Sequence, residues 1–151
     1  MISEHISYKE GVYSITATRL GVDNTPSDEQ LANMELVAEK VFEPLREWVG
    51  GPIKINSFFR GSKLNKAIGG AKSSQHMKGQ AIDIDDTYGV VANSEMYHYI
   101  KENLDFDQLI WEFGDDDNPN WIHVSYVSED SNRRRCLKAY KEQGRSKYIV
   151  I

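Results

Sequence analysis

The chain has 151 residues, of which 40% are hydrophobic and 27% are charged. These values are typical of one soluble globular domain with a single core, which would span residues 1–151. The net charge of −5 argues against a general nucleic-acid binder, and no apolar run reaches the roughly 18 residues that membrane insertion requires.

The first five residues contain no basic segment followed by an apolar one, so we expect no signal peptide.

The first long element that the pattern predicts is a helix beginning after Ser27, which has the spacing of a capping box with Gln30. Apolar residues then recur at three- and four-residue steps as one stripe, formed by Leu31, Met34, Val37, Val41, Leu45 and Trp48. Gly50 ends this helix.

Strands dominate the rest of the chain. Residues 53–59 have a strand composition, whereas residues 61–74 are typical of a loop with at most one helical turn. Further elements are predicted as strands at 80–86, 108–113 and 121–126, a helix at 94–103 and an edge strand at 147–151. This order favours an α+β fold, a mainly antiparallel sheet with helices packed on one face.

Two segments near the carboxyl end are interpreted without a function. The three arginines at 133–135 are expected to form a solvated turn. Cys136, the only cysteine, is expected to pack as a small buried residue. A single cysteine excludes an internal disulfide and a multi-cysteine metal cluster within the chain.

The alternation of the strands predicts where three titratable side chains point. If the fully apolar faces are buried, Asp83, Glu112 and His123 all lie on the opposite, open face of the sheet. A convergence of titratable groups on one face is what a catalytic or metal site requires.

The segment from His76 to Asp83 strengthens the metal hypothesis. A histidine nitrogen and a carboxylate oxygen both bind zinc well, and Gly79 between them can adopt a positive φ that turns the chain. His123 would be a third ligand and would leave a fourth position open, as in catalytic zinc sites. The other two histidines, His5 and His98, are expected to be ordinary surface residues.

Charge is unevenly distributed along the chain. We call residues 53–82 the basic segment, because it has no acid and contains Lys54, Arg60, Lys63, Lys66, Lys72 and Lys78. Residues 102–117 contain seven acids and no Lys or Arg. Such runs are usually solvated surfaces, but they could also attract an anionic substrate and line a metal site.

The motifs resemble those of a known peptidase family. Residues 74–83 fit S-x-H-x-x-G-x-A-x-D, the signature of zinc D-alanyl-D-alanine carboxypeptidases and their phage-endolysin relatives. Residues 57–65 resemble that family's S-G-Y-R-S-x-x-L-N stretch, with Phe58 and Phe59 in place of Gly and Tyr, and residues 121–125 resemble its W-x-H-x-S stretch. The resemblance implies a hedgehog/DD-peptidase-like fold.

The resemblance also implies roles for individual residues. His76, Asp83 and His123 match zinc ligands, Ser74 matches a residue lining the substrate site, and Arg60 matches an arginine that binds substrate and stabilises the oxyanion. The implied substrate is a peptidoglycan stem peptide, cut by a monomeric, phage-type lysin that is made in the host cytoplasm and acts on the cell wall after release.

The general base departs from the family pattern. Many members have Glu or Asp three residues before the last ligand, where this chain has Asn120. Residues 107–112 resemble the D-x-x-x-x-E segment of hedgehog domains, which favours Glu112 as the base. The loop acids Asp115–Asp117 are alternatives, and Asp85 is a candidate for orienting a ligand histidine.

Several alternatives remain open at this stage. A zinc-binding module without catalysis and a phage tail or baseplate component would carry the same ligands. The motifs also do not distinguish D,D-carboxypeptidase, D,D-endopeptidase and L-Ala-D-Glu peptidase activity.

Overall fold

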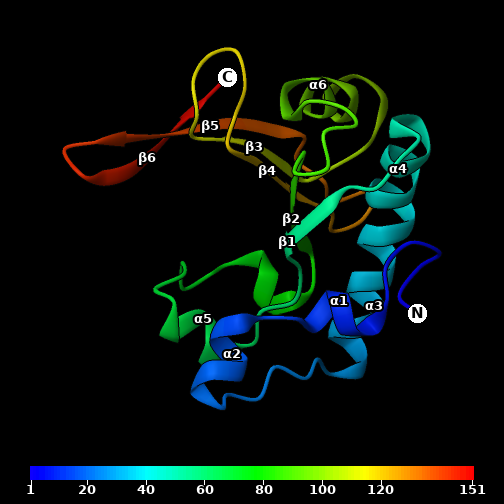
Figure 1. Cartoon of the computed structure of the whole chain (residues 1–151), viewed down its shortest axis with the longest axis vertical. Helices are drawn as coiled ribbons and strands as arrows, with labels where there is room; N and C mark the ends of the chain where they lie inside the picture. Colours follow the sequence, from blue (N-terminus) through cyan, green and yellow to red (C-terminus); the bar gives the residue numbers. More distant parts are fainter.

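The frame of the molecule is one mixed sheet of six strands, shown in Figure 1 by a computed structural model that describes residues 1–151. The strands are β1 (Lys54–Ser57), β2 (Ala81–Asp85), β3 (Gln108–Glu112), β4 (Trp121–Ser125), β5 (Arg135–Glu142) and β6 (Arg145–Val150). Their order is β1-β2-β4-β3-β5-β6. All neighbouring strands are antiparallel except β3 and β5, which are parallel, so the expected antiparallel sheet is only partly right.

The helices do not all lie on one face of this sheet, which corrects part of the predicted architecture. They are α1 (Tyr8–Val12), α2 (Ile15–Leu20), α3 (Asp28–Val37), α4 (Glu43–Val49), α5 (Ser62–Ala67) and α6 (Asn93–Asn103). Helices α3, α4 and α6 cover the apolar face, whereas α2 and α5 line a pocket that opens on Asp83. None of the helices is both long and apolar enough to cross a membrane.

The predicted capping box of the first long helix is confirmed. The backbone N–H of Gln30 donates to the Ser27 side chain, and the Gln30 side chain accepts from the Ser27 N–H. The helix continues through a π-helical turn, Ala38–Phe42, into α4, where Pro44 has no N–H to donate to the preceding turn. Gly50 ends it at a φ of 75°, as expected.

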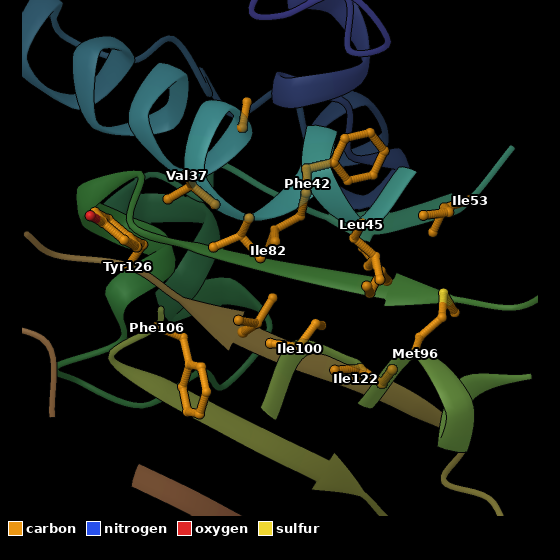
Figure 2. Close-up of a cluster of buried hydrophobic side chains, with 14 of the residues drawn as sticks. Val37, Phe42, Leu45, Ile53, Ile82, Met96, Ile100, Phe106, Ile122 and Tyr126 are labelled. Atoms are coloured by element: carbon orange, nitrogen blue, oxygen red, sulfur yellow. The ribbon is translucent and has the colours of Figure 1, made fainter. Parts of the chain in front are cut away.

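One core of 24 buried residues joins the sheet to these helices. In Figure 2, Val37, Phe42 and Leu45 lie on the helical side of this core, facing strand residues that include Ile82 and Ile122. Each fully buried Leu or Ile side chain of this kind contributes about 1.5–3 kcal/mol relative to exposure. Cys136 is part of the same core, as predicted, but Trp48 is 44% exposed and stacks on Tyr99 instead.

Strand β5 was not predicted, and the three arginines at 133–135 are exposed, as expected, but do not form a turn. Arg133 pairs with buried Asp107, and Arg134 donates to the Lys101 and Leu104 carbonyls at the end of α6. Residue 135 is the first residue of β5.

The β5–β6 hairpin turns at Gln143 and Gly144, which both have positive φ (52° and 76°). That combination is typical of a two-residue type I′ turn, which more often carries Asn-Gly. Figure 1 shows this hairpin extending away from α3 and α4.

Candidate metal centre and active site

Three side chains that could bind a metal ion meet at the open face of the sheet. The Oδ1 atom of Asp83 lies 3.2 Å from Nε2 of His76 and 3.0 Å from Nδ1 of His123. One ligand atom from each residue lies within 4.8 Å of the others. Asp83 and His123 are directly opposite each other on β2 and β4, so the antiparallel register points both side chains to the same side.

His76 reaches the other two residues from a 3₁₀ turn, Gln75–Lys78, that α3 holds in place. The Gln30 side chain donates to the Met77 carbonyl (3.2 Å), and the Asn33 side chain donates to the Lys78 carbonyl (2.9 Å). Gly79 then turns the chain at a φ of 73°, and a Cβ there would lie 2.4 Å from the Gln30 carbonyl oxygen. Only glycine fits this turn between His76 and β2.

The protonation of these side chains suits a divalent metal such as zinc. Nδ1 of His76 lies 2.7 Å from the Phe58 carbonyl oxygen, a contact that fixes the proton on Nδ1 and leaves Nε2 free as a ligand. Burial would raise the pKa of Asp83, but the two histidines hold it well below its ordinary value, so the carboxylate is ionised. Two nitrogens and one carboxylate oxygen form a donor set that fits zinc.

Glu112 lies on the same face as this cluster, as the strand alternation predicts. It is 93% buried by accessible surface and sits opposite Trp121 on β4, next along that strand face to His123. Burial is the main cause that raises the pKa of Glu112 to about 7. The charge of His123 opposes this rise, and the charge of Asp83 adds to it. A carboxyl group with a pKa near neutrality can both accept and return a proton.

Two of the three alternative bases are engaged elsewhere, and the third, Asp117, is exposed in the loop. The Asp115 carboxylate accepts hydrogen bonds from the Asp117 and Asn118 N–H groups of its own turn. Asp116 is 91% exposed and pairs with Lys138. Asn120 is exposed, and its backbone N–H donates to the Glu112 carbonyl, which closes the end of the hairpin.

Arg60 and Ser74 lie together beside the candidate ligands. The Arg60 guanidinium donates to the Ser74 hydroxyl (3.4 Å), and the Arg60 N–H donates to the His76 carbonyl (3.2 Å). Burial lowers the pKa of Arg60, and the negative charge of Asp83 opposes this. Its Nε is buried without a partner, so the side chain keeps unused donor capacity.

An open pocket of about 410 Å³ lies next to this cluster. Its floor includes Asp83, Arg60 and Trp121, and its walls come from α2, α5 and β1. Exposed apolar residues on the rim, including Ile15 and Ile68, give it a mixed polar and apolar lining. The pocket is large enough to take part of a peptide.

The basic segment and the acidic residues 102–117 differ in how their charges are paired. Four exposed lysines of the basic segment have no acidic partner within 4 Å, and these are Lys63, Lys66, Lys72 and Lys78. The acids of residues 102–117 do not form a wall around the metal cluster. Asp105 and Asp107 pair with arginines, and Glu112 alone among the seven has its charge coupled to Asp83 and His123.

The expectation for Asp85 is wrong. Its carboxylate accepts from the Asn93 side chain (2.7 Å) and the Thr87 hydroxyl, and no histidine contacts it. The group that orients a candidate ligand is the Phe58 carbonyl, which the side-chain pattern could not indicate because it is backbone. The other histidines behave as expected: His5 bonds to Glu43 at the surface, and His98 is exposed.

The sequence analysis did not identify the role of Asn24. Its side chain donates to the Val12 and Phe59 carbonyls and accepts from the Gly61 N–H. It therefore clamps the backbone on both sides of Arg60. An asparagine directly before a Thr-Pro pair in a loop was the available signal.

Comparison with known families identifies the family of this chain. The model of a family described as Peptidase M15 matches residues 4–125, which include all the residues discussed above as ligands, base and substrate contacts. Comparison with curated proteins found no match. Because the family match covers well over half of the chain, the chain belongs to the peptidase M15 family, whose members are zinc-dependent peptidases.

Proposed function

We propose that this member of the peptidase M15 family hydrolyses the peptide stems or cross-links of bacterial peptidoglycan, using zinc held by His76, Asp83 and His123. The observation that carries the proposal is the position of a buried carboxyl group, Glu112, on the same sheet face as the three candidate ligands. A site for metal binding alone would not need a desolvated acid whose pKa is near 7.

The candidate ligands are prepared for zinc by their surroundings. The Phe58 carbonyl sets the tautomer of His76, and the strand register sets the direction of Asp83 and His123. When bound, zinc supplies Lewis acidity, which polarises a carbonyl group and acidifies water. The remaining chemistry falls to side chains of the protein.

Glu112 is the proposed general base and acid. Its carboxylate takes a proton from the attacking water and then returns that proton to the leaving amine nitrogen. Burial strengthens this carboxylate as a proton acceptor, and bound zinc would favour the ionised form that takes the proton. Asn120 cannot replace it, since an amide does not accept a proton at neutral pH.

Arg60 and Ser74 are proposed to bind the substrate. The guanidinium is partly buried and keeps unused donors, so it can hold the carbonyl oxygen as negative charge develops on it. Ser74 orients that guanidinium and also accepts from the His76 N–H (3.3 Å). The Asn24 clamp restricts the backbone that carries Arg60.

The nature of the substrate rests on charge and on sequence likeness. Peptidoglycan stems carry free carboxylates, and the unpaired lysines of the basic segment would attract them. The resemblance of residues 74–83 to phage endolysins supports a lysin that is made in a host cytoplasm and acts on the wall after release. The bond that is cut could join D-Ala to D-Ala, a cross-link, or L-Ala to D-Glu.

The test is a digestion of purified peptidoglycan by the zinc-loaded protein, with the new amino termini identified by mass spectrometry. Cleavage should fall by about two to four orders of magnitude in Glu112→Gln, the usual contribution of a positioned acid–base group. Asn120→Ala is the matched control and should cost far less. Zinc content should stay near wild type in both variants, and neither variant should melt at a lower temperature than the wild type.

Two results would contradict the proposal. Normal cleavage by Glu112→Gln together with loss of cleavage in an Asp115, Asp116 or Asp117 variant would move the base to the loop. A zinc-loaded wild type that cleaves no peptidoglycan bond would favour a zinc-binding module without catalysis, or a structural component of a phage particle.

A further inference from the structure

Tyr148 lies in a row of residues that crosses the open face of the sheet. In that row Trp121 on β4 pairs with Glu112 on β3, Glu112 pairs with Ala139 on β5, and Ala139 pairs with Tyr148 on β6. Directly paired residues point to the same side of a sheet. Tyr148 therefore shares its face with Glu112 and the candidate metal cluster.

Only Ala139 stands between Tyr148 and Glu112. Neighbouring strands lie about 4.8 Å apart, so two spacings separate the backbones of β3 and β6 by about 10 Å. Ala139 is completely buried although it lies on the open face, so larger side chains around it close over it. A tyrosine leaning across an alanine can bring its hydroxyl close to the Glu112 carboxyl.

The electrostatics agree with this placement. Partial burial raises the pKa of the Tyr148 phenol, and the negative charges of Glu112 and Asp83 raise it further, as expected for a hydroxyl facing the cluster. No hydrogen bond contributes to that shift, and Tyr148 is 53% exposed. The hydroxyl is therefore protonated and free to donate to a ligand.

The hairpin that carries Tyr148 lies outside the part of the chain that matches the family. The match ends at residue 125, whereas β5 and β6 occupy residues 135–150. The pocket of α2, α5 and β1 lies on the β1 side of the metal cluster, and Tyr148 lies on the β6 side. The two features flank Glu112 from opposite directions.

We infer that the β5–β6 hairpin forms the second wall of the substrate cleft and that Tyr148 binds the substrate there. The inference rests on the proposed function, because it takes the peptide substrate from it. An extended peptide laid across the strands would place one part in the pocket and another against Tyr148. The Tyr148 hydroxyl would donate to a peptide carbonyl or carboxylate one or two residues from the scissile bond, while its ring packs against the substrate backbone.

The test uses soluble stem peptides released from peptidoglycan and the full-length, zinc-loaded protein. Tyr148→Phe should raise KM by about 2- to 10-fold, the range for one neutral hydrogen bond, with kcat within about twofold of wild type. Tyr148→Ala should raise KM more. Tyr140→Phe is the matched control, because Tyr140 is on the same hairpin but pairs with Lys147 on the opposite face, and it should match wild type.

Two other outcomes would contradict the proposed role of Tyr148. Unchanged KM in both Tyr148 variants of an active enzyme would overturn the role of Tyr148 and leave the proposed function intact. A loss confined to kcat would also overturn substrate binding and make Tyr148 a positioning residue for Glu112.

An inactive wild type would instead refute the proposed function, and direct titration of the zinc-loaded protein with the same stem peptides would then test Tyr148. Weaker binding by Tyr148→Phe but not by Tyr140→Phe would still support the second wall. Absent binding, or equal binding by both variants, would overturn it.

Discussion

Glu112→Gln should stabilise the zinc-free protein increasingly as pH rises, because the wild type must ionise a buried carboxyl group. The pKa of Glu112 is 4.5 in an ordinary setting and about 7 in the folded chain, where burial is the largest cause. In the unfolded chain the group therefore loses its proton at lower pH than in the folded chain. The protonated carboxyl group therefore makes its whole contribution to the free energy of unfolding of the wild type below about pH 4.5, and this contribution is lost as pH rises toward 7.

The magnitude follows from the same two values. One pKa unit corresponds to about 1.4 kcal/mol, so the full penalty above pH 7 is about 3 kcal/mol, of which about 2–3 kcal/mol develops between pH 5 and pH 8. Glutamine has nearly the same size and no charge, so the variant avoids this penalty.

The assay is urea unfolding of both proteins in a chelator at several pH values from 5 to 8. The difference in free energy of unfolding should grow with pH in favour of Glu112→Gln. Asp117→Asn removes the same charge from an exposed loop position and should show no such trend. A difference that stays flat from pH 5 to 8 would refute the reasoning, because Glu112 would then be solvated and not on the packed site face. Saturating zinc should reduce the trend, since a nearby cation favours the ionised carboxylate.

Elemental analysis should find one zinc per chain in the wild type and none in the His76→Ala, His123→Ala double variant; full zinc occupancy in that variant would refute the proposed ligand set. Neutralising two of the four unpaired lysines of the basic segment should flatten a fall in cleavage rate between low salt and about 0.2 M salt, where the screening length drops below about 10 Å; an unaltered salt dependence would make them an ordinary solvated surface. Gly79→Ala should destabilise the fold by more than the roughly 1–2 kcal/mol expected for a positive φ alone, because its Cβ would meet the Gln30 carbonyl, and it should weaken zinc binding. Gly89→Ala, which has a similar φ of 69° in open space, is the control for urea unfolding, and equal losses in the two variants would contradict the clash.

Local patterns predicted much of this fold because short-range chemistry decides those features. The capping box of Ser27 and Gln30 needs only three residues of separation, and the αL position of Gly50 needs only one residue type. The side-chain period of a strand fixed the face of Glu112 before any neighbour was known. Strand β5 and its parallel pairing with β3 were not predicted. The two paired strands are distant in sequence, and Gln143-Gly144 is an uncommon hairpin turn.

The sequence by itself determined the chemical types at the site: two histidines, two acids and an arginine within motifs of suitable spacing. Only the tertiary structure decided which of these groups meet and how each is tuned. The Phe58 carbonyl that orients His76 is invisible in a side-chain pattern, and Asp85 pairs with Asn93 although strand parity placed it beside Asp83. The raised pKa of Glu112 and the approach of Tyr148 depend on burial and on strand order, which arise when segments distant in sequence pack together.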